Sequence, residues 1–186
     1  MNIANQLVIV TSTGGFIVSS DTQGISISKP HNTIGFKSSS FCDCVFDKVE
    51  LSFSNGFESD LTQTRAFIKL ITSSIGIGIM KSAFEHAEKY SKERTQFGKQ
   101  IGEFEAIQNM LQKMEIDITA SRLMLWKMAA ENKISEKETN NVFLFIKNAC
   151  EQNTIEAVQI LGGYGYSKEY PVEKLMRDAK MLQMFE

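Results

Sequence analysis

The chain has 186 residues, of which 42% are hydrophobic and 23% charged, and its formal net charge is -2. These values are ordinary for a globular protein and give no electrostatic basis for binding nucleic acid or an acidic membrane. No apolar run approaches the roughly 20 residues needed to span a bilayer, and the N-terminus resembles neither a secretory signal nor a transit peptide. We therefore expect an intracellular protein of one domain, or of one domain and a small part of another.

The three cysteines, Cys42, Cys44 and Cys150, are odd in number and poorly spaced for a disulfide framework. Cys42 and Cys44 fall on one face of an alternating strand pattern, which leaves a metal site as an alternative. No other Cys or His lies near them in sequence. We expect small buried thiols in a reduced compartment and no metal site.

The first part of the chain is predicted to form β structure. Residues 7–11 alternate, Gly14-Gly15 are expected to turn the chain, and residues 16–19 complete a hairpin. Residues 25–28 form a further strand. The run from Phe41 to Leu51 is apolar on both faces and is expected to be buried on both. So few strands cannot close a sandwich or barrel.

The rest of the chain is predicted to be helical. A first helix is expected over 61–92, with a Gly76 and Gly78 face that needs a close helical neighbour. A second helix shows apolar residues at three- and four-residue steps from Phe104 to Leu125, the spacing of a bundle.

Two further helices complete the helical part. The third is expected to open at a capping box, Ser135 to Glu138, and to run toward Leu161. The fourth is expected over residues 169–186, with Pro171 in its first turn. The predicted fold class is α+β, mainly α. A partial antiparallel β domain over residues 1–56 precedes an up-and-down four-helix bundle over 57–186.

Three stretches carry recognisable motifs: residues 90–102 (YSKERTQFGKQIG), 158–166 (VQILGGYGY) and 169–186 (EYPVEKLMRDAKMLQMFE). Together they resemble the C-terminal part of flavin-dependent acyl-CoA dehydrogenases, most like the medium-chain branch. The resemblance runs from about Gln6 to Glu186. It has no counterpart of the family's N-terminal domain or of the strands that hold the flavin ring.

The resemblance implies that Glu186 is the catalytic base, which removes the α-proton of an acyl-CoA thioester. Other branches of the family place the base at the position of Ile68, and isoleucine cannot accept a proton. Lys69 stands at a substrate-binding position of the family. Read without the resemblance, a glutamate at position 186 is a solvated carboxylate at a chain end.

The resemblance also implies FAD binding, with Arg94 on the pyrophosphate because guanidinium binds phosphate oxygens bidentately. The other implied cofactor positions are Thr95, Gln96, Phe97, Glu105, Gln159, Ile160, Leu161, Gly162 and Gly163. Without the resemblance, residues 90–102 are a charged helix end with a glycine stop, and residues 159–163 are a helix C-cap.

The implied function is the α,β-dehydrogenation of fatty acyl-CoA in β-oxidation, with electrons passed to an electron-transfer flavoprotein. The family assembles as a dimer of dimers, in the bacterial cytoplasm or the mitochondrial matrix. Because the flavin-ring strands have no counterpart, we expect the chain alone to be inactive. The alternative is a non-catalytic, truncated or decayed paralogue that keeps the bundle as an oligomerisation module. Ala66, Lys69 and Glu105 depart from the family pattern and favour it.

Overall fold

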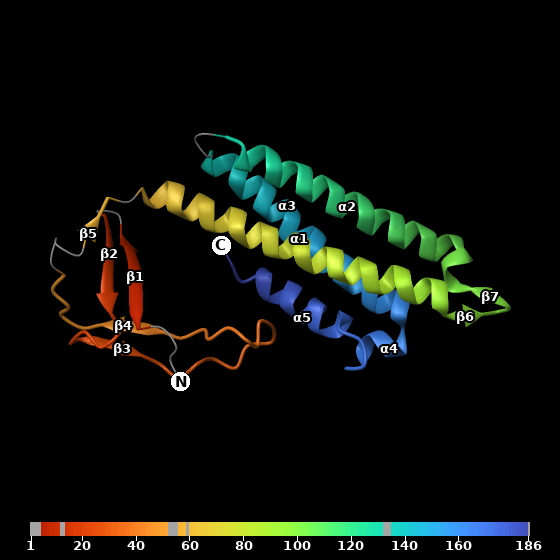
Figure 1. Cartoon of the computed structure of the whole chain (residues 1–186), viewed down its shortest axis with the longest axis horizontal. Helices are drawn as coiled ribbons and strands as arrows, with labels where there is room; N and C mark the ends of the chain where they lie inside the picture. The colour runs from red at the N-terminus through yellow and green to blue at the C-terminus, as the bar shows by residue number, and fades with distance from the viewer. Residues whose placement is uncertain (1–4, 12–13, 52–55, 59, 132–134, 186) are drawn as a thin grey trace. The chain divides into compact units, whose positions relative to one another are not determined.

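The computed structural model describes residues 5–11, 14–51, 56–58, 60–131 and 135–185. The chain divides into two compact units, the first comprising Met1–Thr33 and Lys37–Arg65 and the second comprising Ile34–Phe36 and Ala66–Glu186. The strands β1 to β5 belong to the first unit, and four long or medium helices dominate the second (Figure 1).

The first unit contains two small antiparallel sheets. One has the strand order β1 (Gln6–Thr11), β2 (Gly14–Ser19) and β5 (Gly56–Phe57), and the other pairs β3 (Ile25–Ile27) with β4 (Cys44–Phe46). The predicted hairpin of β1 and β2 is confirmed. Gly14 and Gly15 were wrongly expected in its turn, because they pair with Thr11 and Val10 inside the sheet.

The prediction of a long strand from Phe41 to Leu51, buried on both faces, is wrong. Only Cys44–Phe46 is a strand, and Val45 and Phe46 are 58% and 46% exposed. The reason is that β4 pairs on one side alone, with the three-residue β3. Cys44 is consequently exposed, contrary to expectation, whereas Cys150 is buried in the second unit.

The second unit is built on helices α1 (Leu61–Glu93), α2 (Glu105–Ala129), α3 (Glu136–Leu161) and α5 (Val172–Leu182), which lie roughly along one direction (Figure 1). A hairpin of β6 (Thr95–Gln96) and β7 (Lys99–Gln100) and a 3-10 turn, Ile101–Glu103, join α1 to α2. A single helical turn, α4 (Gly163–Tyr166), follows α3. The predicted fold class, mainly helical α+β with a small antiparallel β region, is confirmed.

The bundle core consists of apolar side chains from four helices. The predicted seam of α2 is correct, since Met114 and Ile118 are buried. Gly76 of α1 lies against α3 and α5, where a Cβ would come within 3.3 Å of Ile146 and Leu182. A Cβ added at Gly78 would meet none of the described residues within 4 Å. The fully buried apolar core residues include Met80, Ala83, Ala87, Met114, Ile146, Cys150, Ala157, Leu161, Val172, Ala179 and Leu182.

The start of the third predicted helix agrees with its sequence signal, whereas the bounds of the fourth differ from those predicted. Ser135 caps α3, with its Oγ accepting a hydrogen bond from the Glu138 N–H at 3.4 Å. The fourth helix is shorter than predicted, beginning after Pro171 and ending at Leu182. The amides of residues 183, 184 and 185 each bond three residues back, to the carbonyls of residues 180, 181 and 182, so the helix tightens into a 3-10-like turn.

Helix α1 corrects the expectation that no run is long and apolar enough to cross a membrane. By length and composition it qualifies, with a mean hydropathy of 1.3 over its most apolar 18-residue window. This is weak evidence, because core helices of soluble proteins pass the same test and 44% of the window is buried. Packing in the bundle accounts for the buried part of this composition, whereas Phe67, Ile68, Ile71 and Ile75 of α1 are exposed.

Cys150 should be chemically inert in the folded protein. Burial raises the pKa of its thiol to about 12, and the carboxylates of Glu151 and Asp178 add to the rise. The thiolate is the reactive form, so at pH 8 its population is roughly a thousandfold below that of an ordinary cysteine. A disulfide reagent at pH 8 is expected to label Cys44 promptly and Cys150 only in denaturant. Equal labelling rates in native buffer would contradict this placement.

Candidate functional site

A cavity of about 990 Å³ lies between the end of α1, the β6–β7 hairpin, the start of α2, the end of α3 and α4. Eight of the ten residues that the resemblance assigns to the cofactor line it. They are Arg94, Gln96, Phe97, Gln159, Ile160, Leu161, Gly162 and Gly163. Thr95 and Glu105 are exposed and do not line it.

Arg94 lies between the end of α1 and the β6–β7 hairpin. Thr95 pairs with Gln100 and Gln96 with Lys99, which leaves Phe97 and Gly98 as a two-residue turn. Both have positive φ, 50° and 82°, as a type I′ turn requires. The backbone of Arg94 is fixed from both sides, because its N–H donates to Tyr90 and its carbonyl accepts from Ile101, each at 2.9 Å.

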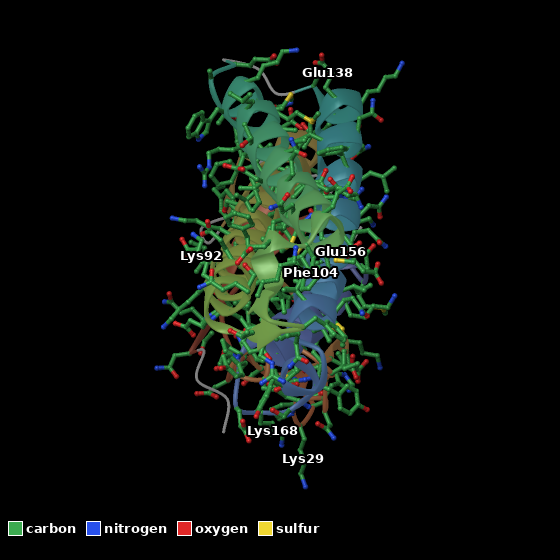
Figure 2. All side chains as sticks on the ribbon, turned by 90° about the vertical axis from the view of Figure 1, so that its right-hand side faces the viewer. Lys29, Lys92, Phe104, Glu138, Glu156 and Lys168 are labelled. Carbon is green, nitrogen blue, oxygen red and sulfur yellow. The ribbon has the colours of Figure 1, made fainter. Side chains whose placement is uncertain are left out.

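Phe97 is held at the cavity edge in an unfavourable state. A bulky residue rarely adopts φ near 50°, and the Phe97 side chain is 93% exposed, so burial gives it no compensation in this chain. Its ring meets the edge of Phe104, with centroids 6.3 Å apart, and the Lys99 ammonium lies 4.4 Å from the centre of the Phe104 ring. Phe104 lies where the hairpin region passes into α2 (Figure 2).

The cavity combines one unpaired cation with an apolar floor. Among the described residues, the Arg94 guanidinium has neither an ion-pair nor a side-chain hydrogen-bond partner. Burial raises the pKa of Tyr90, one turn earlier, while Arg94 acts in the opposite direction. Ile160 and Leu161 are buried beneath the cavity, and Glu169 contributes a carboxylate to its lining. Such a site suits a ligand with an anionic group and an apolar or aromatic body.

The glycine turn leaves the backbone bare beside the cavity. Gly162 ends α3 with φ 58°, and its N–H donates to the Gln159 carbonyl at 3.1 Å. Within the part of the chain that the structure describes, a Cβ at Gly162 or Gly163 would meet nothing within 4 Å. These residues therefore leave room for a ligand to approach the backbone. Glycine turns that bind cofactors provide the same close approach.

The predicted substrate position, Lys69, does not line this cavity. Lys69 lies on α1 and donates to the Asn140 side chain of α3 at 2.8 Å. Ile68 is exposed and Ala66 buried. Glu186 lies outside the described residues. Its neighbour Phe185 makes an edge contact with Phe36, with ring centroids 6.4 Å apart.

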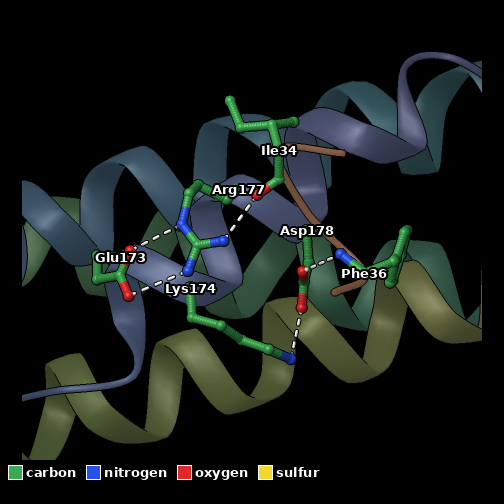
Figure 3. A network of polar contacts seen from close by, with 6 residues as sticks. All are labelled: Ile34, Phe36, Glu173, Lys174, Arg177 and Asp178. Carbon is green, nitrogen blue, oxygen red and sulfur yellow. Dashed lines mark hydrogen bonds and ion pairs between the residues drawn. The ribbon is translucent and has the colours of Figure 1, made fainter. Parts of the chain in front are cut away.

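A second polar cluster fixes α5 (Figure 3). Arg177 forms two hydrogen bonds to Glu173, and its Nη1 donates to the Ile34 carbonyl at 2.7 Å. These contacts lower the pKa of Glu173 and raise that of Arg177. Asp178, only 2% exposed, accepts from the Phe36 N–H at 2.7 Å and pairs with Lys174. Residues 34–36 are thus bound along α5.

With this geometry described, comparison with known proteins identifies the family. The family model described as "Acyl-CoA dehydrogenase, C-terminal domain" matches residues 57–186, well over half of the chain. The chain belongs to the acyl-CoA dehydrogenase family, whose members are FAD-binding oxidoreductases.

Individual relatives agree with this assignment. The chain is 35% identical to an acyl-CoA dehydrogenase of Bacillus subtilis and 33% identical to the caffeyl-CoA reductase-Etf complex subunit CarC of Acetobacterium woodii. Each match covers 92% of this chain and 48% of the relative. The structure of butyryl-CoA dehydrogenase from Megasphaera elsdenii matches with TM-score 0.86 and 31% identity, covering 92% of this chain and 47% of that one. The chain thus spans about half the length of the curated relatives it matches.

Several cavity residues were missed by the motif reading. Tyr90, Tyr164 and Tyr170 form a cluster of aromatic rings 5.7–6.3 Å apart, and the first two line the cavity. A signal was present, since Tyr90 precedes Arg94 by one helical turn and Tyr164 follows the glycines. Ile107, one turn into α2, also lines the cavity. The spacing of Ile107 in the sequence predicted only a core position, because the buried side of α2 and the cavity lining share this residue.

Proposed function

We propose that this chain is the C-terminal part of an FAD-dependent acyl-CoA dehydrogenase that removes hydrogens from the α and β carbons of fatty acyl-CoA thioesters. The observation that supports it best is the convergence of eight motif residues on one cavity around an unpaired guanidinium. Membership of the family supplies the reaction type. The finer points, fatty acyl substrates and Glu186 as base, are carried over from the motif.

The cavity residues have distinct tasks in this proposal. Arg94 binds the cofactor's pyrophosphate, for which a guanidinium with no counterion among the described residues is suited. Gly162 and Gly163 let the backbone approach, Gln159 and Gln96 offer side-chain hydrogen bonds, and Ile160 and Leu161 form the apolar floor. FAD, when bound, supplies the acceptor for the β-hydride. The Glu105 carboxylate opens α2 and is exposed, away from the cavity lining.

Glu186 is the base of the proposed reaction. The α-proton of a thioester is only weakly acidic, so it needs a carboxylate within hydrogen-bond reach. Apolar surroundings raise the pKa of such a group toward neutrality, where it is most effective as a base. Met181 and Phe185 near the end of α5 are partly buried and can supply apolar surroundings. Lys69 is proposed to contact the acyl-CoA substrate.

The proposed partners follow from the family. They are an acyl-CoA substrate, an electron-transfer flavoprotein and further copies of the subunit in a dimer of dimers. The name of the Acetobacterium woodii relative places that protein in a complex with Etf. The named relatives come from bacteria, which supports a bacterial cytoplasmic location over the mitochondrial matrix.

A non-catalytic assembly module is the second candidate. It is favoured by Lys69, whose ammonium is engaged by Asn140 in the folded bundle, and by the alanine at position 66. A chimera separates the two functions, with this chain replacing the matching half of the Bacillus subtilis relative. Flavin absorbance that acyl-CoA bleaches supports the enzyme. A colourless chimera that still self-associates in the ultracentrifuge supports the module.

Arg94→Gln should weaken FAD binding by this chimera about 10- to 150-fold, because a hydrogen bond to a charged group contributes roughly 1.5–3 kcal/mol. The measurement is flavin fluorescence titration of the apoprotein. Lys92→Gln is the matched control, since Lys92 is engaged by Glu88 at 2.7 Å and does not line the cavity. Equal affinities for the two variants would remove Arg94 from the cofactor site.

A further inference from the structure

The Tyr90 side chain is buried in the wall of the cavity, yet its hydroxyl is unpaired. Tyr90 is 8% exposed and lines the cavity. Within the described ranges of the chain, its Oη makes no hydrogen bond, and the unpartnered oxygens sealed from solvent are those of Ser73, Ser121 and Asn153. The Tyr90 hydroxyl therefore keeps its access through the cavity. A buried tyrosine ordinarily has a partner for this group, so a partner from outside the chain is expected.

Two neighbouring rings hold the Tyr90 ring in place. The Tyr170 ring meets it edge-on, with centroids 5.7 Å apart, and the Tyr164 ring lies 6.3 Å away at an angle of 58°. Tyr164 and Tyr170 also contact each other, with centroids 6.1 Å apart. Three mutually packed rings restrict one another's movement. The position of the Tyr90 hydroxyl is therefore set before any ligand binds, which lowers the entropic cost of using it.

The Arg94 guanidinium lies on the same side as this hydroxyl. The Arg94 N–H donates to the Tyr90 carbonyl at 2.9 Å, so the helical bonding pattern of α1 continues to Arg94. Side chains four residues apart share one face of a helix, and both of these line the cavity. Burial raises the pKa of Tyr90 above its ordinary value, while Arg94 is close enough to oppose the rise. Burial has the larger effect, so the hydroxyl keeps its proton at neutral pH and can donate it.

We propose that Tyr90 is a second phosphate-binding residue of the cavity, whose hydroxyl donates a hydrogen bond to a phosphate oxygen of the ligand that Arg94 binds. The inference rests on the proposed function, which supplies the pyrophosphate of FAD as that ligand group. The two residues contribute different things: the guanidinium provides charge, and the neutral hydroxyl provides one directed donor. A ligand phosphate would give the Tyr90 hydroxyl the acceptor that the described residues do not provide.

NMR of the full chain labelled with 13Cζ-tyrosine tests this directly, because the labelled carbon bears the hydroxyl. The chain has four tyrosines, and each resonance is assigned by its loss in the corresponding phenylalanine variant. ADP is the probe, since it carries a diphosphate and an adenosine as FAD does, and adenosine is the ligand control. We expect ADP, and not adenosine, to shift the Tyr90 resonance more than that of Tyr166, an 84% exposed residue outside the cavity lining. A Tyr90 shift no larger than that of Tyr166, or an equal shift with adenosine, overturns the proposal.

Affinity gives a second readout in the same chain. Tyr90→Phe keeps the ring and its packing on Tyr164 and Tyr170 but removes the hydroxyl. It should weaken ADP binding roughly tenfold, the lower end of what a hydrogen bond to a charged group contributes. Tyr166→Phe removes a hydroxyl outside the cavity and is the matched control, expected to leave the dissociation constant within a factor of two. Equal dissociation constants for the two variants overturn the proposal.

These outcomes are separate from those that test the proposed function. If acyl-CoA does not bleach the chimera, the dehydrogenase assignment fails, while a Tyr90 shift with ADP still supports the phosphate contact. If Arg94→Gln weakens ADP binding but Tyr90→Phe equals its control, the Tyr90 inference alone fails. Should Tyr90→Phe unfold, the shift in the unmodified chain decides, because the variants of the other three tyrosines identify the Tyr90 resonance by elimination.

Discussion

Glu186→Gln is expected to lower kcat of the chimeric enzyme by about 10²- to 10⁴-fold, the range that a positioned general base contributes. The amide matches the carboxylate in size but cannot accept the α-proton, so substrate binding should change little. Stopped-flow measurement of flavin bleaching by acyl-CoA follows the step in which this proton leaves. Glu186→Asp keeps the carboxylate on a shorter side chain, and its loss should be smaller.

Glu115→Gln provides the control for this experiment. Glu115 is exposed on α2 and lies outside the cavity, so the same change of charge there should leave the bleaching rate within a factor of two. Activity in the Glu186→Gln chimera equal to that control would assign the base to another residue. The position of Ile68 offers no replacement in this chain, since its side chain carries no titratable group.

Helix prediction succeeded where one physical pattern acts over many residues. The 3.6-residue period of α2 fixed the face that buries Met114 and Ile118, and the Ser135 cap fixed the start of α3. Strand prediction failed at Phe41 to Leu51, because burial of a strand depends on partners far away in sequence. The end of α5 was missed for a related reason, since its last turn tightens without a Gly or Pro signal.

The candidate site was predictable to the extent that it is contiguous. The stretches 94–97 and 159–163 are each recognisable as a motif in the sequence. Only the fold shows that they line one cavity. Asp178 has a role that local sequence could not reveal. It sits in a motif that helped set the register of the C-terminal helix, but its partner Phe36 lies 142 residues earlier in the chain. Lys147 and Phe185 are likewise joined only by the packing of α3 on α5.

Gly35→Ala should be among the most destabilising single substitutions in the second unit. A Cβ at this position would lie 2.4 Å from the Arg177 carbonyl oxygen and 2.8 Å from the Asp178 Cα, and backbone atoms of a helix cannot move aside. The segment 34–36 would have to leave α5. The Arg177 bond to Ile34 and the Asp178 bond to Phe36 would break together, leaving a buried carboxylate with Lys174 as its remaining partner.

Hydrogen bonds to charged groups contribute about 1.5–3 kcal/mol each, so the expected loss in the free energy of unfolding is about 3 kcal/mol or more. Chemical denaturation followed by far-UV circular dichroism measures it. Gly163→Ala is the matched control, because a Cβ there meets open space and should cost less than about 0.5 kcal/mol. Asp178→Asn should cost less than Gly35→Ala, and the double variant should cost less than the sum, because both act on one contact. Additive losses, or a Gly35→Ala protein as stable as Gly163→Ala, would mean that segment 34–36 does not stabilise α5.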